Sequence, residues 1–163
     1  MSKLISLTQG KVALVDDADF EWLNQWKWHA CKGTRTYYAK RESPTILMHR
    51  EILGLKFGDG IETDHRNGDG LDNRRENLRK CTNAENCHNR VHLCSRKSSI
   101  YKGVNWDKRK QKWQARTRYE GKSIFLGYYD SEIDAARAYD RAALKYFGEF
   151  AKPNFKEICY SYV

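Results

Sequence analysis

The side chains most suited to chemistry in this sequence lie in one short stretch. Asp64 and His65 are adjacent, and Asn77 and Asn86 follow at spacings of 12 and 9 positions. An imidazole exchanges a proton near neutral pH, and carboxylate and amide oxygens are ligands of hard cations such as Mg²⁺. An Asp-His pair alone would mean little, but the pair and two spaced asparagines together indicate a candidate site.

The elements around these residues are predicted to be a strand at 61–65, a wide Gly-, Asp- and Asn-rich loop at 66–77, and a returning strand at 78–81. The competing interpretation is that the polar residues only form turns. That explains Asn67-Gly68 and Asp69-Gly70 well. It does not explain the Asp-His pair or the spaced asparagines.

A helix is predicted to follow the hairpin. Thr82 and Glu85 fit a capping box, in which each side chain bonds a backbone N–H at the start of a helix, here expected over 83–91. A hairpin packs against the helix that follows it, so the Asp64-His65 pair should come close to Asn86. Successive strand residues point to opposite faces, so a bend near His65 is needed for both members to serve one site.

The whole segment resembles the ββα-metal fold of HNH nucleases, particularly phage homing endonucleases. The matching string runs from Ile61 to Arg79 and from Thr82 to Asn86. The resemblance implies that His65 is the general base in phosphodiester hydrolysis and that Asn77 orients it by tying the loop together. It also implies that Asp64 and Asn86 hold one divalent cation per active site, Mg²⁺ or Mn²⁺. Asn86 replaces a histidine common in the family, and an oxygen pair suits these hard ions better than zinc or nickel.

Other polar residues are weaker candidates. His88 points to a different helix face from Asn86 and is expected at the surface or at a phosphate. Asn73 competes with Asn77 but fails on spacing, and His49 is expected to be structural. A zinc site is conceivable at three cysteines, although their spacing is wrong for a zinc knuckle: Cys81, Cys87 and Cys94.

Positive charge is concentrated in the second half of the chain. The formal net charge is +9, and residues 94–163 carry 15 basic against 8 acidic side chains, whereas residues 1–93 carry 15 against 13. Such a concentration favours a polyanionic partner, because neutralised phosphates release condensed counterions. A solvated basic surface is the alternative.

Residues 100–156 are predicted to form three strands, at 101–105, 112–118 and 123–128, and then a helix that ends near Gly148. Strings that begin at Tyr101, Trp113, Leu126, Ala135 and Pro153 resemble the plant AP2/ERF DNA-binding domain. The resemblance implies a three-stranded sheet in the major groove of double-stranded DNA, with the helix packed behind it.

The resemblance also implies which side chains contact DNA: Lys102, Asn105, Arg116, Arg118, Ser123 and Phe125. Lys108, Arg109 and Lys112 lie in the first hairpin turn, which is one residue longer than the plant pattern, so their register is open. Asn105 and Ser123 replace arginines of the family and Phe125 replaces a tryptophan, so the plant target sequence is not carried over. The linker residues Arg96 and Lys97 are expected to touch the DNA backbone.

The sequence therefore predicts an α+β protein: a strand-rich support region at 1–60, an HNH core at 61–93, a basic linker at 94–99 and an AP2-like domain at 100–156. The predicted function is a homing-type DNA endonuclease that nicks its site. A catalytically inactive DNA-binding regulator and an RNA-binding module are the alternatives.

The remaining composition narrows the class of protein. Five cysteines form no CxxC pair, which argues against a disulfide framework. No apolar run is long enough to cross a membrane. We expect a cytoplasmic protein, in the bacterial host if phage-encoded, with no obligatory protein partner.

Overall fold

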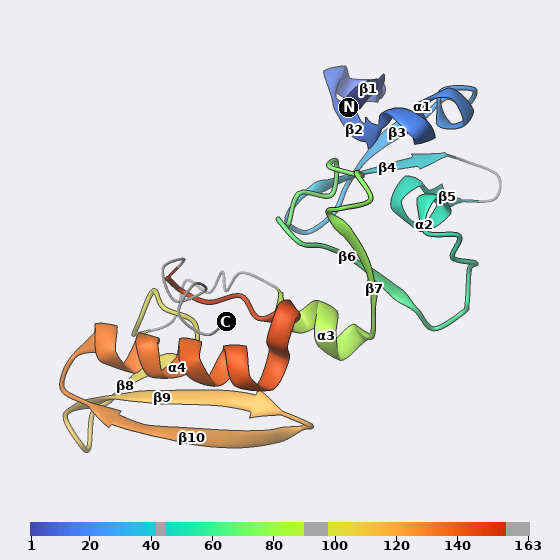
Figure 1. Ribbon diagram of the computed structural model, residues 1–163. Helices are drawn as coiled ribbons and strands as arrows, with labels where there is room; N and C mark the ends of the chain where they lie inside the picture. The colour runs from blue at the N-terminus through green and yellow to red at the C-terminus, as the bar shows by residue number, and fades with distance from the viewer. Residues whose placement is uncertain (42–44, 90–97, 156–163) are drawn as a thin grey trace. The chain divides into compact units, whose positions relative to one another are not determined.

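The computed structural model describes residues 1–41, 45–89 and 98–155 (Figure 1). It divides into two compact units, Met1–Cys87 and His88–Val163, which are described separately. Within the described residues, no helix is both long and apolar enough to span a membrane.

The first unit contains two hairpins, a small three-stranded sheet and short helices. The hairpin of β1 and β2 is followed by α1, and β3, β4 and β5 form a sheet in that order. The helix α2 then leads to the hairpin of β6 and β7, and α3 closes the unit. The bounds are β1 Ser2–Ser6, 3-10 helix Thr8–Gly10, β2 Val12–Asp16, α1 Asp17–Leu23, β3 His29–Lys32, β4 Tyr37–Arg41, β5 Ile46–Leu47, α2 Met48–Ile52, β6 Glu62–His65, β7 Leu78–Cys81 and α3 Asn83–His88.

One apolar core joins the N-terminal strands and helices of this unit to β7. Ile5, Trp28 and Met48 are almost fully buried in it, and Leu78 of β7 belongs to the same cluster. Trp28 is further fixed because its indole N–H donates to the Leu23 carbonyl at 2.8 Å. The strand-rich N-terminal region and the β6–β7 hairpin are thus parts of one packed body.

The β6–β7 hairpin has the predicted antiparallel form, with Asp64 opposite Arg79 and His65 opposite Leu78. The predicted capping box is present: Glu85 N donates to Thr82 Oγ1 at 3.3 Å, and Thr82 N donates to Glu85 Oε2 at 2.7 Å. The helix α3 ends at His88, earlier than the predicted 91. Residues 90–97, and with them the linker contacts expected of Arg96 and Lys97, lie outside the described residues.

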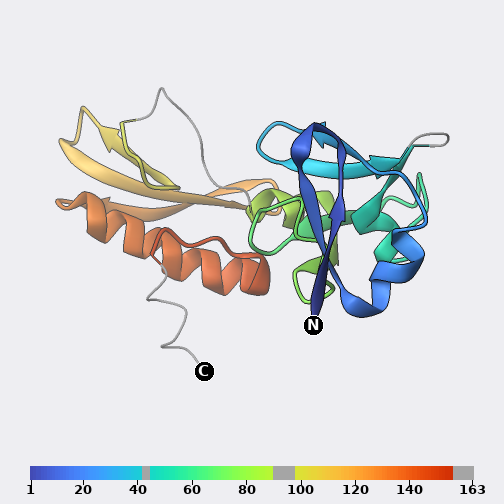
Figure 2. The same cartoon turned by 90° about the horizontal axis from the view of Figure 1, so that it is seen from above.

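The second unit is a three-stranded antiparallel sheet, β8 Val104–Asp107, β9 Lys112–Tyr119 and β10 Lys122–Tyr129, in the order β10-β9-β8. The helix α4, Glu132–Phe147, lies along one face of the sheet (Figures 1 and 2) and is followed by the 3-10 helix Gly148–Phe150. The fold is therefore mixed α+β, as predicted.

Small side chains let α4 approach the sheet closely. Ala135 and Ala136 are fully buried against Val104 and Ala115. Gly103 is required for the same reason, because a Cβ there would lie 1.9 Å from the Tyr139 ring. The described residues of this unit leave the opposite face of the sheet uncovered, and that face carries the exposed residues of β9 and β10.

The end of the described chain is tied back to the start of the sheet. Asn154 Oδ1 accepts from the backbone N–H of Lys102 at 2.7 Å. The buried Asp140 carboxylate of α4 accepts from the backbone N–H groups of Asn154 and Phe155 at 2.8 and 2.9 Å. This explains why the predicted closing Pro-Asn-Phe string follows the helix.

Candidate active site

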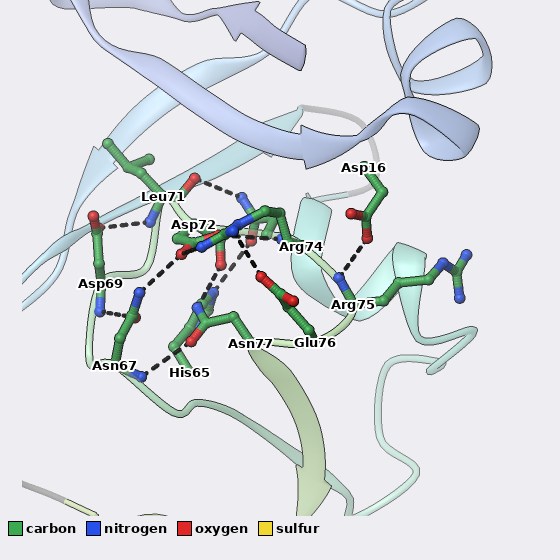
Figure 3. Close-up of polar contacts among 11 residues, drawn as sticks. Asp16, His65, Asn67, Asp69, Leu71, Asp72, Arg74, Arg75, Glu76 and Asn77 are labelled. Atoms are coloured by element: carbon green, nitrogen blue, oxygen red, sulfur yellow. Dashed lines mark hydrogen bonds and ion pairs between the residues drawn. The ribbon is translucent and has the colours of Figure 1, made fainter. Parts of the chain in front are cut away.

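The loop between β6 and β7 is held against the N-terminal hairpin (Figure 3). Leu14 of β2 donates its N–H to the Leu71 carbonyl at 2.8 Å, and its own carbonyl accepts from Asn73 N at 2.7 Å. The Arg75 N–H donates to Asp16 Oδ2 at 2.8 Å. The N-terminal strands thus fix the shape of the loop that surrounds His65.

Asn77 closes this loop from inside. Its side-chain oxygen accepts from the Asn67 N–H at 3.0 Å, and its amide nitrogen donates to the Asp72 carbonyl at 2.7 Å (Figure 3). Its carbonyl also accepts from Arg66 N at 2.9 Å. A buried amide with its oxygen and nitrogen both bonded to backbone ties together the two ends of the turn that follows His65.

His65 ends β6 and is buried, with its Nε2 3.2 Å from Asn73 Oδ1. The Asn73 amide nitrogen donates to the Leu71 carbonyl at 3.4 Å and faces Met48 Sδ at 3.5 Å, so its oxygen is the atom turned toward the imidazole. An amide oxygen can only accept, so His65 Nε2 carries the proton. The lone pair of the neutral ring is then on Nδ1.

Two aromatic side chains of the N-terminal region border the His65 ring. The His49 ring meets it edge-on at 5.1 Å between centroids, and the Tyr38 ring lies 5.9 Å away. Burial lowers the pKa of His65 below the ordinary 6.5, against the opposing effects of Asn73 and the Asp64 charge. Burial also lowers the pKa of His49, to about 3. Both rings are therefore neutral at neutral pH.

Asp64 lies beside His65 in sequence but is engaged elsewhere. Its carboxylate is buried, and Oδ2 accepts from Arg79 Nε at 2.7 Å with Arg79 Nη2 at 2.5 Å. This pair follows from the strand register, which sets residues 64 and 79 opposite each other. The structure thus brings His65, Asn73 and Asn77 into one polar loop, while Asp64 pairs with Arg79 across the hairpin.

Asn86 stands in the middle of α3, half-buried, with its N–H bonded to the Thr82 carbonyl at 3.0 Å. A carboxylate and an amide oxygen are the donor types that Mg²⁺ and Mn²⁺ prefer, with water and substrate phosphate completing the shell. The residues at positions 64 and 86 therefore fit such an ion by donor chemistry.

The structure gives little support to the alternative zinc site at Cys81, Cys87 and Cys94. Burial raises the pKa of the Cys81 thiol to about 11, whereas zinc binds thiolate. Cys94 and the side chain of His88 are outside the described residues. In the described part of the chain, no group of three His, Cys, Asp or Glu side chains is placed to hold a metal ion.

Sequence reasoning missed three neighbours of the site: Asn73, His49 and Arg79. The spacing disfavours Asn73 relative to Asn77, yet Asn73 is the residue bonded to His65. Arg79 could have been found from the predicted hairpin register. The contact between His49 and His65 is a packing result that residue spacing does not encode.

The open face of the second unit carries the predicted DNA-contact residues of the strands. Arg116 and Arg118 are exposed. Ala115 and Thr117, which alternate with them along β9, are buried on the side of α4. Ser123 and Phe125 of β10 lie opposite Arg118 and Arg116. Asn105 of β8 lies opposite Gln114, which extends this face by a residue outside the predicted contact set.

The other predicted contacts lie before the first strand of the sheet, in the turn between β8 and β9, and at the start of β9. Lys108 and Arg109 are in the turn between β8 and β9, and the Arg109 N–H donates to Asp107 Oδ1 at 3.0 Å. Lys112 forms an ion pair with Asp130 at 3.0 Å. Lys102 precedes β8, where its backbone is bonded to Asn154.

Comparison with known proteins finds two families along the chain. Residues 47–88 match the HNH endonuclease family, and residues 99–149 match the AP2 domain family. The chain thus carries a segment similar to the HNH endonuclease family, followed by a segment similar to the AP2 domain family. The HNH segment begins at β5, so it includes α2 and its His49 as well as the β6–β7 hairpin.

The curated relatives are similar to the AP2 domain. An AP2-like ethylene-responsive transcription factor of Arabidopsis thaliana is 43% identical over 72 residues, which is 37% of this chain and 16% of the relative. The ethylene-responsive transcription factor WRI1 of the same plant is 40% identical over 79 residues, 41% of this chain and 18% of the relative. APETALA2-like protein 2 of Oryza sativa is 44% identical over 59 residues, 36% of this chain and 14% of the relative. The chain thus spans less than a fifth of the length of these relatives.

Proposed function

We propose that this protein is a DNA endonuclease in which the AP2 domain selects the site and the HNH segment hydrolyses a phosphodiester bond. The observation that carries the proposal is the hydrogen bond between His65 and Asn73, which leaves the basic nitrogen of a neutral imidazole on Nδ1. A general base must be unprotonated at working pH, and burial of His65 favours that state.

In the proposed reaction His65 Nδ1 accepts the proton of the water that attacks phosphorus in line. The bond from phosphorus to the leaving 3′ oxygen then breaks. Asn73 holds the imidazole plane, and Asn77 holds the loop that carries both. A bound Mg²⁺ or Mn²⁺ supplies stabilisation of the charge that develops on the phosphate and on the leaving oxygen.

Asp64 and Asn86 are the residues that would hold that ion. The Arg79 guanidinium fixes the Asp64 carboxylate through Oδ2. A ligand that is already held in place loses little freedom when it binds, and partners of metal ligands commonly contribute in this way. Arg79 would therefore position the ligand.

The AP2 sheet would read DNA through the exposed side chains of β9 and β10, with Arg116 and Arg118 as its central cations. A homing-type role and a single-strand nick are part of the proposal, since one catalytic centre per chain cuts one strand. The bacterial cytoplasm and the absence of an obligatory protein partner remain expectations.

The test is plasmid cleavage by the full chain in Mg²⁺ and in Mn²⁺, followed by electrophoresis of supercoiled, nicked and linear forms. His65→Ala should lower the rate by about 10²- to 10⁴-fold, the usual contribution of a general base. Asp64→Asn should raise the Mg²⁺ or Mn²⁺ concentration that gives half-maximal cleavage, because the neutral amide binds a divalent cation more weakly than a carboxylate.

A catalytically inactive DNA-binding regulator is the second candidate. The observation that favours it is the same Asp64–Arg79 ion pair, because a guanidinium that neutralises the Asp64 carboxylate would weaken its binding of a cation. For the regulator, the expected result is site-specific binding without cleavage in either metal. Preference for structured RNA over duplex DNA at equal salt would contradict both DNA-directed functions.

A further inference from the structure

The open face of the AP2 sheet carries a chain of hydrogen bonds between neighbouring strands. Gln114 of β9 donates from Nε2 to the hydroxyl of Tyr128 in β10 at 3.1 Å. The Tyr128 hydroxyl in turn donates to Asp107 Oδ2 of β8 at 3.1 Å. All three strands thus contribute one member.

The donor-to-acceptor direction of these two hydrogen bonds fixes the orientation of the Gln114 amide. A phenol has a single proton, and Tyr128 gives it to the Asp107 carboxylate, which can only accept. The Tyr128 oxygen therefore offers Gln114 only a lone pair, and the amide must present its nitrogen side. The Tyr128 ring is itself held, because it packs on the Phe125 ring at 5.0 Å between centroids.

A β-bulge makes this arrangement possible. The register between β9 and β10 shifts between Phe125 and Gly127, so Tyr128 lies opposite Gln114. Phe125 and Tyr128 are both exposed, although strict alternation over three positions would put them on opposite faces.

One side of the Gln114 amide is then left for a ligand. Its second N–H and its oxygen Oε1 form no hydrogen bond with the described residues. They lie on the same face as Arg116 and Asn105. An adjacent donor and acceptor match the N7 acceptor and N6 donor that adenine shows in the major groove. Guanine offers two acceptors there, so one of the two amide groups would be unmatched.

We infer that Gln114, held by Tyr128 and Asp107, is a specificity-determining residue that reads adenine in the target site. The inference rests on the proposed reading of duplex DNA by this sheet. Holding the amide before binding lowers the entropy that is lost in the complex, so a single side chain can discriminate strongly.

The experiment is selection of bound duplexes from a randomised library by the full chain without divalent metal, followed by sequencing. The wild type should enrich adenine at one position, and Gln114→Ala should lower that preference by about 5- to 150-fold, equivalent to the discrimination of one bidentate contact. Gln114→Glu keeps the shape but can only accept, so its preference should move to cytosine, whose N4 is a donor. Tyr128→Phe should weaken the adenine preference and leave the rest of the motif in place.

Gln111→Asn is the control, because Gln111 lies in the turn before β9 at φ 53, a conformation that asparagine tolerates. It should keep the wild-type motif. If both Gln114 variants keep the wild-type adenine preference, Gln114 does not read adenine and the inference is overturned. The proposed reading of DNA by the sheet would still hold in that case. A wild type that selects no motif overturns the proposed reading itself, and the inference with it. Circular dichroism and retained affinity for random duplex at low salt identify variants that are folded.

Discussion

Asn73 Oδ1 lies 3.2 Å from Nε2 of His65, and this contact defines which imidazole nitrogen can act as a base. Asn73 is fully buried and is held in turn by the backbone of the N-terminal hairpin. The orientation of His65 thus depends on residues far away in sequence.

Replacing Asn73 by Ala should reduce catalysis more than binding. Without the amide oxygen the imidazole loses the partner that sets its tautomer, so kcat should fall about 10- to 100-fold, as for partners that orient metal-bound histidines, with KM nearly unchanged. Loss of buried hydrogen bonds should also lower the free energy of unfolding by about 1–3 kcal/mol. Steady-state cleavage and urea denaturation measure the two effects.

The conservative variant Asn73→Asp retains an acceptor and should recover part of kcat. Its added negative charge favours the protonated imidazole, so the acid limb of the pH profile should move upward. Equal losses of kcat in the Ala and Asp variants would mean that Asn73 serves only the packing of the loop.

The pH profile of cleavage follows from the lowered pKa of His65. A base works in its unprotonated form, and burial extends that form to pH values below 6.5. The acid limb of kcat/KM should therefore have its midpoint under pH 6.5, measured at saturating Mn²⁺ with substrate binding checked at each pH. A midpoint above 6.5 would show that another group or a different His65 environment controls the rate.

Stability should fall on acidification because His49 is buried in neutral form. Its pKa is about 3 in the folded chain against 6.5 ordinarily, so the unfolded state binds more protons between these values. The free energy of unfolding should therefore decrease from pH 7 to pH 5, and His49→Leu should reduce that decrease. Tyr38→Phe, which keeps the ring beside His49, should behave as the wild type. Equal wild-type stability at both pH values would contradict the burial argument.

Gly70 is required by the close approach of neighbouring groups. A Cβ at this position would lie 2.5 Å from the Tyr37 carbonyl oxygen and from the Tyr38 ring. Gly70→Ala should displace the loop, destabilise the unit by about 1–3 kcal/mol and lower cleavage. Thermal unfolding and cleavage assays test this. Gly68→Asn is the comparison, because Gly68 has open space where a Cβ would stand and only its φ of +83 opposes a side chain, a strain that asparagine tolerates better than most residues. Its loss of stability should therefore be smaller than that of Gly70→Ala.

Arg116 should contribute to site choice and not to affinity alone. Arg116→Ala should lose about 1–3 kcal/mol of binding on the selected site if the arginine contacts a guanine. Lys145→Ala, at an exposed position on α4, serves as the control in a fluorescence binding assay. An equal loss on selected and random duplexes would assign Arg116 to a phosphate.

Much of this architecture could be predicted because it is local. The Thr82 and Glu85 capping box, the β6–β7 hairpin and the alternation around Arg116 depend on neighbours in sequence. Sequence alone could not give the shared core of Trp28 and Leu78, which depends on long-range packing. The face on which Tyr128 lies could not be predicted for a related reason: a single β-bulge reverses the face of every residue that follows it in the strand.

The same limit explains the site. Spacing selected Asn77 over Asn73, yet the structure gives Asn77 contacts with the loop backbone and Asn73 the contact with His65. Both side chains are buried amides in one loop, and only the path of that loop over β2 decides which one meets the imidazole.

In the proposed function one chain both selects its DNA site and cuts there, with His65 as the base. The most direct measurement is to sequence the cleavage ends that the full chain produces in Mn²⁺ on a randomised duplex library, with His65→Ala in parallel. Breaks should lie at a fixed distance from a selected motif, and the variant should retain the motif in binding but produce no such ends. Ends that are independent of any motif, or that persist unchanged in the variant, would contradict the proposed function.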